Sequence, residues 1–125
     1  MDAAAEPVES LNAVTLVTAD MAKAVAFYEA LGFHRLYGGA SAVFTSYRAG
    51  PGYLNLQFDP ESSRPTGVWG RAIFWVDDVD GMHRRAIRAG FSPATAPQDA
   101  PWGERYFHIR DPDGHELSFA RPSGT

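Results

Sequence analysis

One internal repeat constrains the fold of this chain more than any other feature. An acidic residue, a glycine and a phenylalanine that bound one expected helix recur around a second, each 58 positions further on: Asp20, Gly32 and Phe33, then Asp78, Gly90 and Phe91. Self-similarity at a fixed spacing indicates two copies of one supersecondary unit. We therefore expect two similar halves.

The first copy predicts a strand, a helix and three further strands. Residues 12–18 alternate between two faces, as in a strand that a helix covers on one side. Asp20 suits the N-cap of the helix, whose apolar residues repeat at helical spacing, and Gly32 suits its C′ position. Three strands follow at residues 33–37, 42–48 and 53–58.

The second copy predicts the same order. A strand at 71–76 precedes a helix that Asp78 caps and that ends at Gly90, and the off-stripe arginines of this helix indicate a solvated face. Middle strands are expected at 91–94 and 106–110, with a long loop from Pro97 to Gly103 between them. A closing strand follows the Asp-Pro-Asp-Gly turn, in a register shifted by one residue.

The fold class is therefore α+β, with two βαβββ modules that form an open, barrel-like cup. The boundaries are a flexible N-terminal tail at 1–10, a first module at 11–58, a linker at 59–69, a second module at 70–121 and a tail at 122–125.

Composition excludes several classes of protein. A chain of 125 residues with 45% hydrophobic content is long enough for one domain. It has no cysteine, which excludes disulfides and thiolate chemistry. No signal peptide or run of about 20 apolar residues is present, so we expect a cytoplasmic protein without a membrane partner. The formal charge of -4 argues against nucleic acid and mildly favours neutral or cationic ligands.

Three segments carry a family resemblance: TADMAKAVAFYEALGF, GRAIFWVDDVD and RDPDGHELSF. They resemble the glyoxalase/bleomycin resistance protein/dioxygenase superfamily, also called vicinal oxygen chelate (VOC) proteins. That resemblance implies that a ligand or metal lies in the cup between modules. Pro101-Trp102-Gly103, followed by an Arg-Asp-Pro-x-Gly hairpin, is most similar to the bleomycin resistance proteins, which implies a homodimer that sequesters an aromatic drug.

The resemblance also implies four metal-ligand positions, one on the first and one on the last strand of each module. The matching residues here are Ala13, Asn55, Arg71 and Ser118. Alanine has no donor atom and arginine is a permanent cation, so these residues do not suit a divalent metal. We therefore expect no metal, no cofactor and no catalytic residue.

Two alternatives remain open. His108, His115 and Glu116 form the only local cluster that a metal could use, as in a lyase, isomerase or dioxygenase with displaced ligands. Strand alternation, however, places His115 and Glu116 on opposite faces. A small-molecule sensor, or a metal-free catalyst, could use Arg71 as an anion anchor, although Arg71 beside Glu116 also reads as an internal ion pair.

The remaining cup residues suit an organic ligand. By strand parity they mix one large aromatic with small and polar groups: Ala13, Thr15, Asn55, Gln57, Arg71, Ile73, Trp75, Glu116 and Ser118. Trp69 and Trp102, both expected in loops, could close over a planar ring, although a lone tryptophan also suits simple packing. The expected partner is an aromatic small molecule, such as a cationic antibiotic.

Overall fold

The computed structural model describes residues 7–65 and 67–123, so parts of both expected tails and one linker residue lie outside the described residues. The first sheet is ordered β1-β4-β3-β2 and the second β5-β8-β7-β6. Among the described residues, neither helix is long and apolar enough to cross a membrane. The elements are β1 (Ala13–Thr18), α1 (Met21–Ala30), β2 (His34–Tyr37), β3 (Phe44–Ala49), β4 (Gly52–Phe58), β5 (Arg71–Trp75), α2 (Val79–Arg88), β6 (Gln98–Ala100), β7 (Glu104–Arg110) and β8 (Glu116–Pro122).

The repeat is confirmed at the level of backbone geometry. The side chain of Asp20 accepts a hydrogen bond from the backbone N–H of Lys23, and Asp78 accepts one in the same way from Gly81. Gly32 and Gly90 have φ angles of 93° and 90°, the left-handed conformation that ends helices. The expected α+β class is also confirmed, since each half is a four-stranded mixed sheet with one helix.

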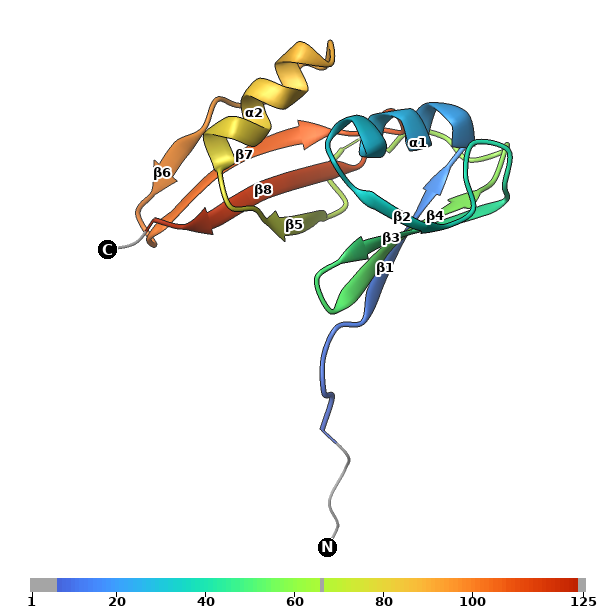
Figure 1. The fold of residues 1–125 in the computed structure, drawn as a ribbon, viewed down its shortest axis with the longest axis horizontal. Helices are drawn as coiled ribbons and strands as arrows, with labels where there is room; N and C mark the ends of the chain where they lie inside the picture. Colours follow the sequence, from blue (N-terminus) through green and yellow to red (C-terminus); the bar gives the residue numbers. More distant parts are fainter. Residues whose placement is uncertain (1–6, 66, 124–125) are drawn as a thin grey trace, which may run out of the picture.

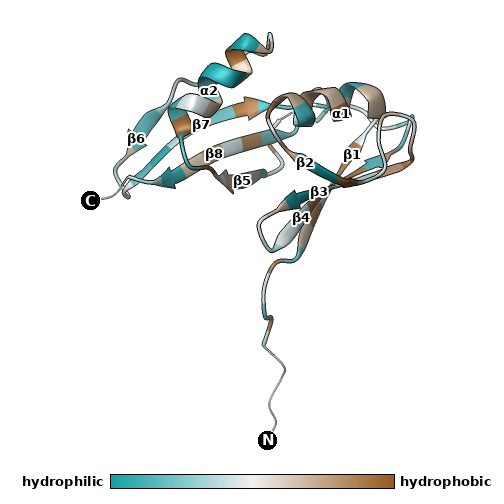
Figure 2. Ribbon diagram, in the orientation of Figure 1, coloured by the Kyte–Doolittle hydropathy of each residue, from teal (hydrophilic) through white to brown (hydrophobic). Residues whose placement is uncertain are grey.

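Both helices lie on the same side of the two sheets (Figure 1). The core between helices and sheets joins the two halves. Phe33, directly before β2, contacts Tyr28 of α1, Phe74 of β5 and Phe119 of β8, with ring centroids 5.1–6.2 Å apart. Figure 2 shows that α1 is mainly apolar, whereas α2 mixes apolar and polar residues. The two helices are also joined by a hydrogen bond, in which Arg85 of α2 donates from Nε to the carbonyl oxygen of Ala30 at 3.0 Å.

One predicted strand is wrong. Residues 91–94 form no strand, and the edge strand of the second sheet is β6, inside the stretch that was expected to be a loop. Pro93 lies within this segment and has no backbone donor, and the next backbone N–H, that of Ala94, donates to the carbonyl oxygen of His108 at 2.8 Å. β6 instead forms a tight hairpin with β7, closed by Ala100 to Gly103, where Gly103 has a φ of 90°.

The turn between β7 and β8, residues 111–115, fastens the second half to the first, and we call it the clasp. Asp111 Oδ1 accepts hydrogen bonds from the backbone N–H groups of Asp113 and His115, each at 2.9 Å, and so holds the turn together. Its other oxygen, Oδ2, accepts from the hydroxyl of Tyr28 in α1 at 2.6 Å. Asp113 accepts from the backbone N–H of Ala19 at 2.9 Å. The last hairpin of the chain therefore bonds directly to its first helix.

Candidate functional site

The face of the second sheet that is turned away from the helices carries three rows of side chains, which we call the cup face. Strand pairing sets the rows, because β5 and β7 both pair with the central strand β8. Alternate residues of β8 point to this face, as the parity argument predicts. The rows are Arg71–Glu116–Arg110, then Ile73–Ser118–His108, then Trp75–Ala120–Tyr106.

The first row is charged. Arg71 donates from Nε to Glu116 Oε2 at 2.6 Å, and its Nη2 contacts the same oxygen. Arg110 approaches the other carboxylate oxygen at 3.8 Å and donates to the carbonyl oxygen of Gly114 at 3.0 Å. The predicted internal ion pair is therefore present, and it includes a second arginine that parity alone did not identify.

The middle row contains a close histidine–serine contact. His108 Nδ1 lies 2.6 Å from Ser118 Oγ, and Ser118 is buried. Burial, together with the positive charge of Arg71, lowers the pKa of His108 below its usual 6.5, and Glu116 opposes that shift. His108 is therefore neutral at pH 7. Its hydrogen bond with Ser118 allows either ring nitrogen to carry the proton, because a serine hydroxyl both donates and accepts.

The third row continues into an aromatic edge. Trp102, at the turn between β6 and β7, stacks on Tyr106 with ring centroids 6.2 Å apart and 21° between their planes. The indole N–H of Trp102 donates to Glu104 at 3.2 Å. A cavity of about 110 Å³ lies over these rows, lined by Arg71, Ile73, Trp102, Glu104, Tyr106, His108, Ser118 and Ala120.

A larger cavity of about 610 Å³ adjoins it and shares Arg71 and Ile73. It lies between β5, the start of β1 and the turn between β3 and β4, and Ala13, Tyr53 and Trp75 also line it. Its volume falls within the range of about 300–1,000 Å³ that is usual for small-molecule pockets. The two cavities bring together six of the predicted residues: Ala13, Arg71, Ile73, Trp75, Trp102 and Ser118.

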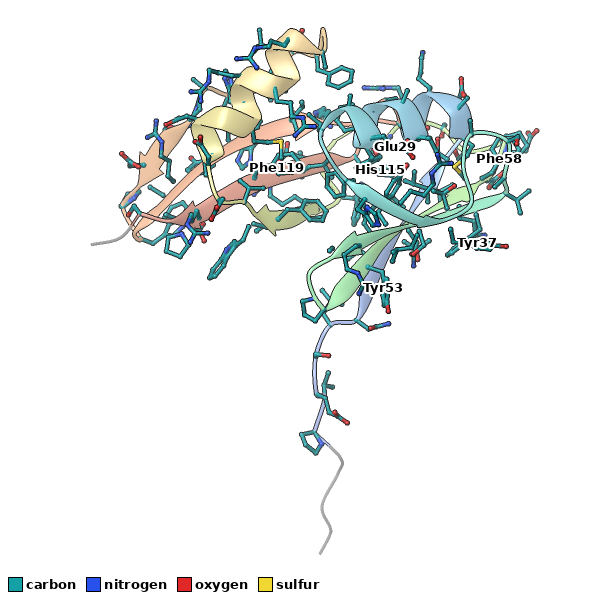
Figure 3. The ribbon with its side chains drawn as sticks, viewed as in Figure 1. Glu29, Tyr37, Tyr53, Phe58, His115 and Phe119 are labelled. Carbon is teal, nitrogen blue, oxygen red and sulfur yellow. The ribbon has the colours of Figure 1, made fainter. Side chains whose placement is uncertain are left out.

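The other predicted residues lie elsewhere. Thr15 and Asn55 bond to each other on the first sheet, where Asn55 Nδ2 donates to Thr15 Oγ1 at 3.3 Å, and Gln57 is exposed nearby. Figure 3 shows Tyr53 and Tyr37 on this same side of the first sheet, away from α1. Among the described residues that line the two cavities, none of these three predicted side chains is found.

Trp69 is fixed to the clasp. Its indole N–H donates to His115 Nδ1 at 3.1 Å, and His115 Nε2 donates to the carbonyl oxygen of Val17 at 2.8 Å. These two bonds fix the neutral form of His115 with its proton on Nε2, and Figure 3 shows this side chain beneath α1. Trp69 therefore lies beside the junction of the halves, and no local sequence pattern predicts its bond to His115.

Comparison with known families identifies the fold. A sequence profile described as the Glyoxalase/Bleomycin resistance protein/Dioxygenase superfamily matches residues 10–119. The chain belongs to this superfamily. The predicted resemblance and the expected VOC fold are both confirmed.

Relatives in the superfamily share the fold across different functions. The chain is 38% identical over 65 residues to the uncharacterized protein Mb0911c of Mycobacterium bovis, a match that covers 50% of this chain but only 43% of that protein. A lactoylglutathione lyase from Agrobacterium tumefaciens superposes with a TM-score of 0.73 at 23% identity, covering 92% of this chain and 95% of the lyase. A bleomycin-binding protein complexed with bleomycin gives 0.71 at 24% identity, covering 91% and 98%.

The four positions where VOC enzymes are expected to hold a metal do not suit one in this chain. Ala13 offers no donor, and Arg71 is held by Glu116. Asn55 turns its amide N–H to Thr15, and the Ser118 hydroxyl is bonded to His108. Together these side chains supply no negative charge and only two neutral oxygen ligands, which does not suit a divalent cation.

The displaced set does not converge either. His115 uses both ring nitrogens at the clasp, whereas Glu116 faces Arg71 on the cup face. Within residues 7–65 and 67–123, no group of three or more histidine, aspartate or glutamate side chains lies close enough to share a metal ion. The structure therefore separates the residues on which the metal-dependent alternative rests.

Proposed function

We propose that this protein binds and sequesters a bleomycin-like or other aromatic small molecule without a metal. The cup face is the observation that carries the proposal. It has aromatic side chains along one edge, Ile73, Ser118 and His108 in the middle row and charged groups at the other end, which is the composition of a site that stacks a ring and orients it. Such a site removes its ligand from solution by affinity alone and requires no bond-making step.

The residues assigned to this site are those predicted from the sequence, together with Tyr106 and His108. Trp102 and Trp75 supply stacking surface, Ile73 and Ala13 leave room, and Arg71, Glu116 and Ser118 orient polar groups. Thr15, Asn55 and Gln57 of the first sheet, and Trp69, remain part of the prediction. Their place in the site depends on whether a second sheet lies opposite the cup face.

We further propose that a homodimer completes the site. Trp75, Trp102 and Ile73 are 67%, 72% and 57% exposed, a concentration of large apolar side chains that marks a surface used for binding. A second copy could place its first-sheet residues opposite these side chains. Sedimentation measurements would contradict this part of the proposal if the chain stayed monomeric at the concentrations where ligand binding saturates. The expected cytoplasmic location also stays a prediction.

Ligand titration followed by tryptophan fluorescence tests the function. Bleomycin and a panel of planar aromatic drugs are added to the protein, and saturable quenching is expected for at least one. Trp102→Ala should weaken that binding about tenfold, because a stacked aromatic pair contributes about 0.5–1.5 kcal/mol beyond its buried area. Ile87→Ala is the control, since Ile87 is a comparably exposed apolar residue on α2.

Two results would contradict the proposal. If no compound in the panel binds, only the fold assignment stands. If protein purified without chelator carries stoichiometric nickel, zinc, iron or manganese, the metal-dependent alternative replaces metal-free sequestration.

A further inference from the structure

We propose that the cup face selects aromatic ligands that carry an anionic group, such as a carboxylate, and disfavours cationic ones. This inference rests on the proposed binding function and adds the charge class of the ligand. It also opposes the expectation from overall composition, because the net charge of -4 favours neutral or cationic ligands. Charge at a site depends on the side chains that face it rather than on the sum over the chain.

The first row of the cup face carries an excess of positive charge. Two arginines share one carboxylate, because Arg71 and Arg110 contact different oxygens of Glu116. The arginine side chains are 40% and 38% exposed, whereas that of Glu116 is 8% exposed. The surface that a ligand meets is therefore mainly guanidinium, with the neutralising carboxylate beneath it.

Donor atoms remain for a ligand. Arg71 contacts Glu116 through Nε and Nη2, and no hydrogen bond or ion pair among the described residues uses its Nη1. A guanidinium presents its N–H groups in a planar fork that matches a carboxylate. A ligand carboxylate can therefore bind the outer edge of Arg71 while the inner edge stays on Glu116.

The second row adds a neutral donor beside the arginines. When the Ser118 hydroxyl donates to His108 Nδ1, the proton of the imidazole lies on Nε2. His108 lines the smaller cavity, so this tautomer offers an N–H to a bound anion. The other tautomer presents Nε2 as an acceptor, so the selection against a cation rests on the arginines of the first row.

The aromatic edge lies on the far side of the same surface. Rows one and three are four residues apart along β8, which corresponds to about 13 Å at the usual rise of a strand. Glu104, the carboxylate among the described residues that line the smaller cavity, lies at that far end and accepts a hydrogen bond from the indole of Trp102. The arrangement fits an elongated ligand with its ring at Trp102 and Tyr106 and its anion at Arg71.

Three probes of matched shape test the charge selection: biphenyl-4-carboxylate, its neutral carboxamide and the cationic biphenyl-4-methylammonium. Calorimetric titration at pH 7.5 should give the carboxylate an affinity about tenfold above the amide, with the cation weakest. Arg71→Gln should remove the preference for the carboxylate. Arg84→Gln, on α2, is the control and should leave all three affinities unchanged.

A second variant avoids reliance on a loss of binding. Arg71→Gln deprives buried Glu116 of its nearest partner and could impair folding, whereas Glu116→Gln keeps an oxygen acceptor for Arg71 and removes the negative charge. Glu116→Gln should therefore bind the carboxylate about three- to tenfold more tightly and leave the amide unchanged.

The outcomes separate this inference from the proposed function. Equal affinities for all three probes, or tighter binding of the cation, would overturn the charge selection and leave aromatic binding intact. Unchanged carboxylate affinity in Glu116→Gln would overturn it as well. No binding of any probe by the wild-type protein would overturn charge selection, and bleomycin and the drug panel would then decide the binding function on their own.

Discussion

Replacing Tyr28 with phenylalanine tests whether the clasp holds the two halves together. In the wild-type protein the Tyr28 hydroxyl donates to Asp111 Oδ2 at 2.6 Å, and both side chains are buried. Burial, reinforced by Asp111, raises the pKa of Tyr28 well above its usual value, so the hydroxyl keeps its proton and remains a donor. Tyr28→Phe removes the hydroxyl that donates to the buried carboxylate of Asp111 and changes the packing little.

The expected loss is about 2–3 kcal/mol in the free energy of unfolding at pH 7.5. A hydrogen bond to a charged group contributes about 1.5–3 kcal/mol, and the carboxylate left behind is incompletely solvated. Tyr47→Phe is the matched control. The hydroxyl of Tyr47 is also buried and donates to a carboxylate, that of Glu29, but at 3.1 Å and with Glu29 33% exposed. Because water reaches Glu29, this variant should lose only about 1 kcal/mol or less.

The loss from Tyr28→Phe should also depend on pH. Burial raises the pKa of Asp111 above its usual 3.8, whereas the Tyr28 hydrogen bond lowers it. Folded Asp111 thus holds its proton at higher pH than the unfolded chain does, and stability falls as pH rises through this interval. Removing the donor enlarges that fall, so the difference between wild type and variant should shrink as pH drops towards the pKa of Asp111.

Urea unfolding at pH 7.5 and 4.5, at equal protein concentration, measures both effects. Equal concentration matters because association stabilises a folded chain by mass action. A loss below about 0.5 kcal/mol at pH 7.5, or a loss that is the same at both pH values, would refute the reasoning.

Three further variants test the repeat and the cup face. Gly90→Ala should lower the free energy of unfolding by about 1–2 kcal/mol, because the new Cβ meets open space and only the left-handed backbone is unfavourable. Gly32→Ala should lower it further, because its Cβ comes within 2.9 Å of Arg85, whose side chain bonds to α1. Thermal unfolding compares the two variants, and equal losses would contradict this expectation. Because the pKa of His108 is lowered in the folded state, the unfolded chain binds the proton first, and stability is lost as pH falls through 6.5. His108→Gln should therefore make the free energy of unfolding decline less steeply between pH 7.5 and 5.5. An unchanged slope in urea unfolding would contradict this expectation.

The repeat allowed most of the fold to be predicted from the sequence. Helix caps, terminal glycines and alternating strands are local features that can be read from a short stretch of sequence. Each appears twice, so the assignment of Asp20 as a helix cap strengthens the same assignment for Asp78. The strand register was also predicted. Ala13 pairs with Tyr53 and Arg71 pairs with Glu116, and Glu116 lies one residue further from its preceding turn than Tyr53 does, as predicted. Prediction failed at residues 91–94, where Pro93 removes a backbone donor and no strand forms.

The site was predicted less completely, because parity assigns a residue to a face but not to a neighbour. Arg110 and His108 lie on the cup face by the same alternation that selected Glu116 and Ser118, yet only the pairing of β7 with β8 shows that they complete its rows. The contact between Tyr28 and Asp111 joins residues 83 positions apart and leaves no local signal in the sequence. Trp69 was placed in a loop correctly, but its bond to His115 depends on how that loop returns to the turn.

The clasp also determines when the two halves of a newly synthesised chain can bond to each other. The donors that it engages, at Ala19 and Tyr28, are synthesised before the acceptors Asp111 and Asp113. Until those acceptors arrive, the first half has a buried hydroxyl without its partner and an uncovered aromatic face at Phe33. The halves of a newly made chain therefore cannot form these hydrogen bonds until residues 111–115 have been synthesised, and a chain shortened before residue 111 lacks them.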